Sequence, residues 1–98
     1  MIIKLENFKG NPADYLRRAG YVFQKKEGEE SAYIRALSRS GFPRFHLFAS
    51  IRGGDLIMNI HLDQKRATYG SAKRHHGEYS DSSVLEEEIK RIRSTFGA

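Results

Sequence analysis

The chain contains no cysteine among its 98 residues. This absence excludes disulfide bonds, thiolate zinc sites and cysteine nucleophiles, and it suits a reducing compartment. No apolar run approaches the ~18 residues that a membrane-spanning helix needs, and the N-terminus lacks the basic and apolar regions of a secretory signal. We therefore expect a cytoplasmic protein without a membrane-spanning segment.

Acidic residues are missing from one part of the chain. The whole sequence has a net charge of +5, which favours a polyanionic partner. Residues 64–77, called the basic segment below, contain four basic residues and no acidic one, whereas residues 78–98 contain five acidic and three basic residues. A chain of this length predicts one domain, residues 1–98. Long connections without apolar periodicity are often functional, so we expect function in or near the basic segment.

The clearest structural pattern is a β-hairpin over residues 44–63 with Gly53-Gly54 as its turn. Two glycines allow the positive φ angles of a type I′ turn, and a two-residue turn fixes the register. Counting outwards from the turn gives apolar pairs on one face: Ile51–Leu56, Ala49–Met58, Leu47–Ile60 and Phe45–Leu62. The same register places His46 opposite His61 on the other face.

Two helices and three further extended segments complete the predicted fold. Asn11-Pro12 is typical of a helix start, which predicts a short helix over residues 13–19. Residues 83–86, Ser-Val-Leu-Glu, have the pattern of a capping box, so we expect a second helix to begin at Ser83. Apolar residues then recur at helical spacing: Leu85, Ile89, Ile92 and Phe96. With extended segments at 2–8, 21–26 and 31–38, the order (β)αββββα predicts an α+β fold, in which an antiparallel sheet of four or five strands carries both helices on one face.

The histidines suggest a metal site. Directly opposed residues of a hairpin have Cβ atoms ~4.5–5.5 Å apart, so His46 and His61 are close enough to share an ion. Zinc takes four ligands in most sites, and the sequence offers further candidates at His75, His76 and Glu78. One hypothesis is therefore a zinc-type site, with a small metal-dependent hydrolase as its catalytic form. The alternative is that the histidines are solvated and bonded only to their neighbours.

Catalysis without a metal has weaker support. His61 and Asp63 share a strand face as an acid–base pair would, but residues i and i+2 of a strand stand roughly 6–7 Å apart. The sequence contains no nucleophile or phosphate-binding motif to join them. The pattern therefore favours a non-enzymatic binding module.

The basic segment favours nucleic acid as the ligand. Cations bind phosphates, and flat rings stack on bases. The basic segment supplies both kinds of residue: Lys65, Arg66, Tyr69, Lys73 and Arg74. The sheet face away from the helices adds Arg44, His46 and Phe48, and also Tyr33 and Arg35 if their strand pairs alongside. The leading prediction is RNA or DNA binding, and the alternative is a homodimer or protein partner that covers Phe48 and Ile57.

A motif in the C-terminal half resembles a group of short bacterial proteins without an established activity. It consists of Asn59-Ile60-His61-Leu62-Asp63-Gln64-Lys65, then Tyr69-Gly70, then His75-His76-Gly77-Glu78-Tyr79. The resemblance extends to the acidic-to-basic helix that follows. The group tends to separate its two later histidines by one residue, whereas His75 and His76 are adjacent. The resemblance marks a motif and implies no function.

Overall fold

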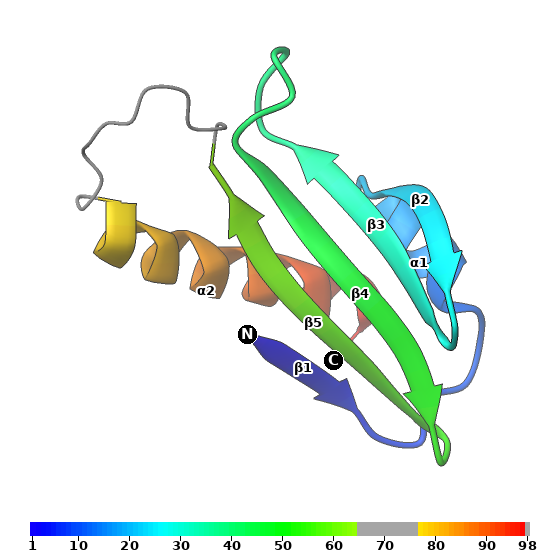
Figure 1. Ribbon diagram of the computed structural model, residues 1–98. Helices are drawn as coiled ribbons and strands as arrows, with labels where there is room; N and C mark the ends of the chain where they lie inside the picture. Colours follow the sequence, from blue (N-terminus) through cyan, green and yellow to red (C-terminus); the bar gives the residue numbers. More distant parts are fainter. Residues whose placement is uncertain (65–76, 98) are drawn as a thin grey trace.

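The computed structural model of the chain describes residues 1–64 and 77–97. Five strands form one antiparallel sheet in the order β1-β5-β4-β3-β2, and both helices lie behind it in Figure 1. The elements are β1 (Ile2–Leu5), α1 (Pro12–Arg18), β2 (Val22–Glu27), β3 (Glu30–Ala36), β4 (Arg44–Arg52), β5 (Asp55–Asp63) and α2 (Gly77–Phe96). This confirms the predicted α+β class and element order. Neither helix, over the residues described, combines the length and apolar character needed to cross a membrane.

The β4–β5 hairpin has the predicted register. Gly53 and Gly54 both have positive φ angles, 58° and 86°, as a type I′ turn requires. Every predicted cross-strand pair is present, including His46 opposite His61. The alternation sends Phe45 and its apolar neighbours toward the helices, and it sends both histidines to the opposite face.

Helix α1 also begins and ends where the sequence predicts. The Asn11 side chain accepts a hydrogen bond from the backbone N–H of Ala13 at 3.0 Å, and Pro12 occupies the first helical position. Gly20 follows the helix with a φ of +95°, a conformation that residues with a Cβ rarely adopt. Leu16 of α1 is fully buried against the sheet.

Helix α2 begins earlier than predicted. It runs from Gly77, so the prediction that Ser83 caps its start is wrong. A capping box is a local pattern that also occurs inside helices, and residues 78–82 contain neither proline nor glycine to stop one. The predicted apolar positions do pack against the core: Leu85, Ile89, Ile92 and Phe96.

β3 pairs alongside β4, but the prediction that Tyr33 and Arg35 then lie on the face away from the helices is wrong. Tyr33 pairs with Leu47 and Arg35 pairs with Phe45, so both lie on the face that the helices cover. The opposite face of β3 presents Ala32, Ile34 and Ala36. The prediction was wrong because the register of β3 against β4 depends on a long turn, which fixes no register by its length. Burial of the Tyr33 ring, which is only 6% exposed, favours the observed arrangement.

The two edges of the sheet differ. β1 pairs with β5 over four residues at one edge. β2 forms the other edge, and all six of its residues are exposed. Its ladder with β3 shifts register between Phe23 and Lys25, which marks a β-bulge.

The core lies between the sheet and the two helices. Each fully buried aliphatic or aromatic side chain contributes roughly 1.5–3 kcal/mol to folding. The largest such side chains come from β1, α1, β4, β5 and α2: Ile3, Leu16, Phe45, Leu47, Leu56, Met58, Ile60 and Ile92. Stacked rings of Tyr15 and Phe96, with centroids 4.8 Å apart, join α1 to the end of α2.

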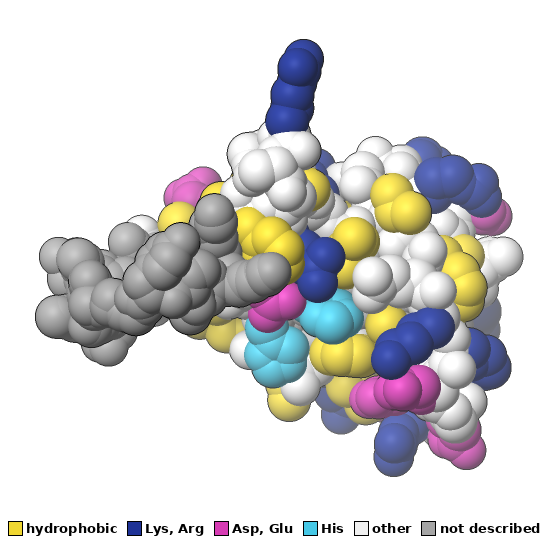
Figure 2. Space-filling model, turned by 45° about the horizontal axis from the view of Figure 1, so that its top comes forward, with side chains coloured by type: hydrophobic (Ala, Val, Ile, Leu, Met, Phe, Trp, Pro, Cys, Tyr) yellow, Lys and Arg dark blue, Asp and Glu magenta, His cyan; other side chains and the backbone are white. Residues whose placement is uncertain are grey.

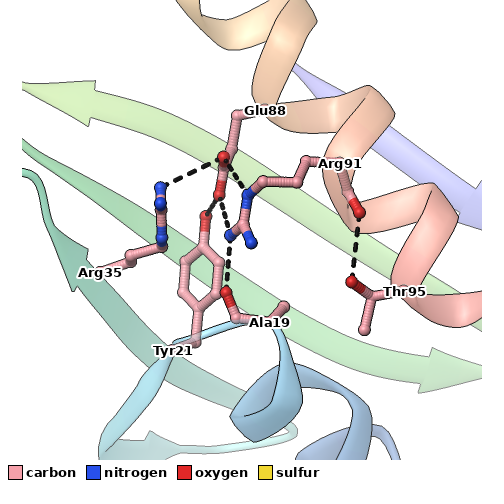
Figure 3. A network of polar contacts seen from close by, with 6 residues as sticks. All are labelled: Ala19, Tyr21, Arg35, Glu88, Arg91 and Thr95. Atoms are coloured by element: carbon pink, nitrogen blue, oxygen red, sulfur yellow. Dashed lines mark hydrogen bonds and ion pairs between the residues drawn. The ribbon is translucent and has the colours of Figure 1, made fainter.

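A buried carboxylate joins the elements around this core (Figure 3). Glu88 of α2 is only 4% exposed, and Tyr21, just before β2, donates a hydrogen bond of 2.7 Å to it. Arg91 donates two hydrogen bonds of 2.9 Å to the same carboxylate, and Arg35 of β3 donates one of 3.3 Å. Arg91 also donates to the carbonyl of Ala19 at the end of α1. Glu88 therefore joins α2 to β3 and to the residue before β2, and Arg91 joins α2 to the end of α1.

This environment raises the pKa values of two of its members, Tyr21 and Arg91. Burial, with the hydrogen bond to Glu88 next in importance, raises the pKa of Tyr21 well above its ordinary value of 10.0. The hydrogen bonds to Glu88 raise the pKa of Arg91. Tyr21 therefore stays neutral and Arg91 stays charged in the folded protein at neutral pH.

Replacing Glu88 with Ala should destabilise the protein strongly. The change leaves Arg35 and Arg91 without their carboxylate, and breaking a buried ion pair on one side costs about 3–5 kcal/mol. Glu87→Ala is the matched control, because Glu87 is 77% exposed and its only described ion pair is the 3.9 Å contact with Lys90. Such surface changes cost less than about 0.5 kcal/mol. Urea unfolding measures both variants, and equal losses would contradict the role given to Glu88.

The raised pKa of Tyr21 predicts that the folded protein loses stability at alkaline pH. This pKa is higher in the folded than in the unfolded protein, so the contribution of Tyr21 is complete below pH ~10 and declines as the pH rises above that value. Tyr21→Phe should remove this part of the decline, so the stability difference between wild type and variant should shrink between pH 9 and pH 11. Urea unfolding at several pH values measures the difference. A constant difference would show that Tyr21 does not contribute to the alkaline loss.

Candidate functional site

The face of the sheet away from α1 and α2, called the outer face below, is the best candidate for a binding surface. No described helix covers it, and Figure 2 shows histidine side chains on it next to an acidic and a basic side chain. Its central residues are apolar, aromatic or uncharged: Ala32, Ile34, His46, Phe48, Ile57, Asn59 and His61. Most of them are half-buried by their neighbours. The centre of the outer face is therefore largely uncharged.

Three rings lie together on the outer face and are called the ring cluster below. His46 and Phe48 are alternate residues of β4, with ring centroids 4.6 Å apart. The ring of Phe48 also lies 6.1 Å from that of His61 on β5, in an edge-on arrangement. Because His46 and His61 are directly opposite each other, the hairpin register brings all three rings together. The ring cluster follows from the strand pattern that the sequence predicts.

Beside the ring cluster lies a second group, Arg44, His46 and Asp63, called the polar cluster below. Asp63 Oδ2 is 3.4 Å from His46 Nδ1 and 3.7 Å from Arg44 Nε. Both distances exceed those of good hydrogen bonds. His46 Nε2 and Arg44 Nε are buried and have no hydrogen-bond partner in the described structure. The polar cluster therefore keeps hydrogen-bonding capacity that its own members do not use.

The ring of Phe42 packs against the guanidinium of Arg44. The guanidinium lies over this ring, 4.5 Å from the centroid, in a cation–π arrangement. Arg44 stands directly opposite Asp63 in the β4–β5 ladder, so the cation and the carboxylate are adjacent. Their side chains remain 26% and 35% exposed, within reach of a ligand.

Asp63 lies next to His46 of the neighbouring strand, 3.4 Å from its Nδ1. The sequence offered His61 and Asp63 as an acid–base pair, but their spacing along one strand is too long for direct contact. Diagonal neighbours across a strand pair are close enough for such contacts. The hairpin register contained this information, since it places Asp63 opposite Arg44 and next to the His46 position.

The metal hypothesis stays a prediction. Within residues 1–64 and 82–97, no three side chains of histidine, aspartate or glutamate are grouped so that they could hold an ion. His46 and His61 are opposite each other as predicted. His75 and His76 lie outside the described residues. Glu78 belongs to α2, and its side chain also lies outside what the structure describes.

The predicted phosphate-binding residues of the basic segment lie outside the described residues as well: Lys65, Arg66, Tyr69, Lys73 and Arg74. The basic segment begins directly after Asp63, which is the last residue of β5 and a member of the polar cluster. Arg44, the remaining predicted member, lies on the outer face next to the ring cluster. Of the described cations on this face, Arg44 and Lys4 each have an acidic neighbour, at 3.7 Å and 3.8 Å.

Asp63 should contribute little to stability. Its contacts are long and partly exposed, so Asp63→Asn should change the free energy of unfolding by less than about 1 kcal/mol. Asp55 at the other end of β5 is a useful comparison, because it accepts a 3.0 Å hydrogen bond from the backbone N–H of Asn7. Asp55→Asn should cost more than Asp63→Asn in urea unfolding. The reverse order would show that the polar cluster serves the fold.

Comparisons with known proteins identify no relative. No protein-family model matches the chain, and neither the curated proteins nor the solved structures contain a match. Function must therefore be argued from the residues of this chain.

Proposed function

We propose that the protein binds single-stranded nucleic acid, RNA or DNA, on the outer face, with the basic segment adding contacts to phosphates. The observation that most supports this function is the ring cluster. Phe48 lies beside His46 and His61 on a sheet face that no described helix covers. None of the three rings belongs to the hydrophobic core, so packing of the core does not account for them.

Stacking supplies the first part of the affinity. Each base stacked on an aromatic ring contributes about 1–3 kcal/mol, with little dependence on base identity. A sheet places rings side by side because alternate residues of one strand and opposed residues of the next share a face. Double-stranded nucleic acid hides the faces of its bases inside the helix, so we expect a preference for single strands.

Charge supplies the second part. Three described cations of the outer face, Arg44, Lys4 and Lys25, each have an acidic neighbour, so these residues attract phosphates only weakly by themselves. The basic segment follows Asp63 in the chain and has four cations without an acidic residue: Lys65, Arg66, Lys73 and Arg74. Contacts to phosphates weaken as salt rises, whereas stacking is much less sensitive. The two parts can therefore be measured separately.

Phe48→Ala should weaken the binding of a fluorescent single-stranded 15-nucleotide RNA of mixed sequence. Loss of one stacked base corresponds to about 5- to 150-fold in the dissociation constant. Phe23→Ala is the matched control, because Phe23 is 54% exposed but lies on β2 beside Tyr33, toward the other face. Fluorescence anisotropy measures both variants. Absence of binding at low salt, or a folded Phe48→Ala variant that binds as wild type does, would refute the proposal.

Replacing Lys65, Arg66, Lys73 and Arg74 together with Ala should reduce the salt dependence. Each lost phosphate contact lowers the slope of log affinity against log salt by about 0.7 for a single strand. Anisotropy titrations from low to high salt give the slope for wild type and variant. An unchanged slope would show that the basic segment makes no phosphate contact.

A homodimer is a second candidate for the same surface. Ile2 and Val22 are 66% and 62% exposed at the two sides of the outer face, with Phe48 and Ile57 half-buried between them. Two copies packed through this face would cover these apolar side chains. Sedimentation at increasing protein concentration, with and without RNA, distinguishes the two candidates. A dimer that forms through the outer face would compete with RNA, so added RNA would reduce the dimer fraction.

A further inference from the structure

The polar cluster offers a row of unused hydrogen-bonding groups at the edge of the ring cluster. Asp63 Oδ2 lies 3.4 Å from His46 Nδ1 and 3.7 Å from Arg44 Nε, and both distances are longer than those of good hydrogen bonds. His46 Nε2 and Arg44 Nε are buried without partners. A ligand cannot reach these two buried nitrogens, but the side chains of Arg44 and Asp63 stay 26% and 35% exposed, so the guanidinium and the carboxylate are the groups that a ligand can contact.

The order of the groups is specific. Asp63 presents only acceptors, and Arg44, directly opposite on β4, presents only donors. A complementary edge therefore has N–H donors next to an acceptor. Guanine has two adjacent N–H donors, N1–H and the N2 amino group, followed by the O6 acceptor. Adenine and cytosine each offer one amino group beside an acceptor, and uracil has a single N–H between two acceptors.

We infer that Asp63 and Arg44 form a guanine-selective subsite for a base that stacks at the edge of the ring cluster. This inference rests on the proposed function and adds the preferred base. The Asp63 carboxylate accepts from N1–H and the N2 amino group, and the Arg44 guanidinium donates to O6. Arginine and the acceptors of guanine are a frequent pairing in nucleic-acid recognition, and the base edges of single strands are read by such hydrogen bonds.

The surroundings of the two residues support the assignment. Phe42 holds the Arg44 guanidinium by its ring contact at 4.5 Å, which limits the conformations that binding would have to fix. His46 stands beside Asp63 on the other side, with Nδ1 toward the carboxylate. A base with acceptors opposite Asp63 would leave the carboxylate unpaired and repelled, so discrimination comes from a penalty as well as from attraction.

The experiment compares four RNA oligonucleotides, each ten nucleotides long, that contain uridine with one central guanosine, adenosine, cytidine or uridine. Anisotropy with wild-type protein should show the guanosine strand bound about 5- to 150-fold more tightly than the others, as expected for a paired base edge. Asp63→Asn should abolish this preference, because the amide replaces one acceptor with a donor. Asp63→Glu retains the carboxylate and should restore part of it.

The matched control is Asp14→Asn, which makes the same change in charge on α1, behind the sheet. This variant should keep the guanosine preference. Thermal unfolding confirms that each variant is folded before binding is measured. Equal affinity for all four strands, with binding still weakened by Phe48→Ala, would overturn the guanine subsite while the proposed function stands. A folded Asp63→Asn protein that keeps the preference would also overturn it, and binding to no strand would overturn both.

Discussion

The arrangement of the molecule depends on the burial of one carboxylate. Glu88 brings Tyr21, Arg35 and Arg91 together, and these residues belong to separate parts of the fold. A charge in a low-dielectric interior is tolerated only when its hydrogen-bonding positions are filled, so the helix can dock in very few ways. The carboxylate thus holds α2 on the same side of the sheet as α1. The outer face is left without a helix as a direct result.

Strand β4 serves two purposes with one alternating pattern. Phe45 and Leu47 point into the core, and the residues between and beyond them, His46 and Phe48, belong to the outer face. Because the inward side chains are completely buried, the backbone that carries the ring cluster is fixed by the core. Sites on packed strands are held more accurately than sites on loops. The ring cluster therefore has a rigid base, whichever ligand it binds.

The sequence predicts those parts of the structure that depend on neighbouring residues. The two-glycine turn fixed the pairing of His46 with His61, and Asn11 with Pro12 fixed the start of α1. The network around Glu88 was not predicted from the sequence. Arg35 and Tyr21 are 53 and 67 residues away from Glu88 in the chain, so no local pattern links them to it. From the sequence, an acidic residue such as Glu88 in the first turns of a helix is expected to face solvent. The inward position of Tyr33 was missed for a related reason, since no short turn fixes the register of β3.

The bulge in β2 has a consequence for the behaviour of the protein in concentrated solution. An edge strand with free N–H and C=O groups can recruit a strand from another molecule, which leads to aggregation. β2 carries exposed Val22 and Phe23 and would invite such growth if its ladder were regular. The register shift before Lys25 interrupts the repeat, and Lys25 and Lys26 place charge on the remaining edge. The sheet is therefore protected against extension by other chains at β2.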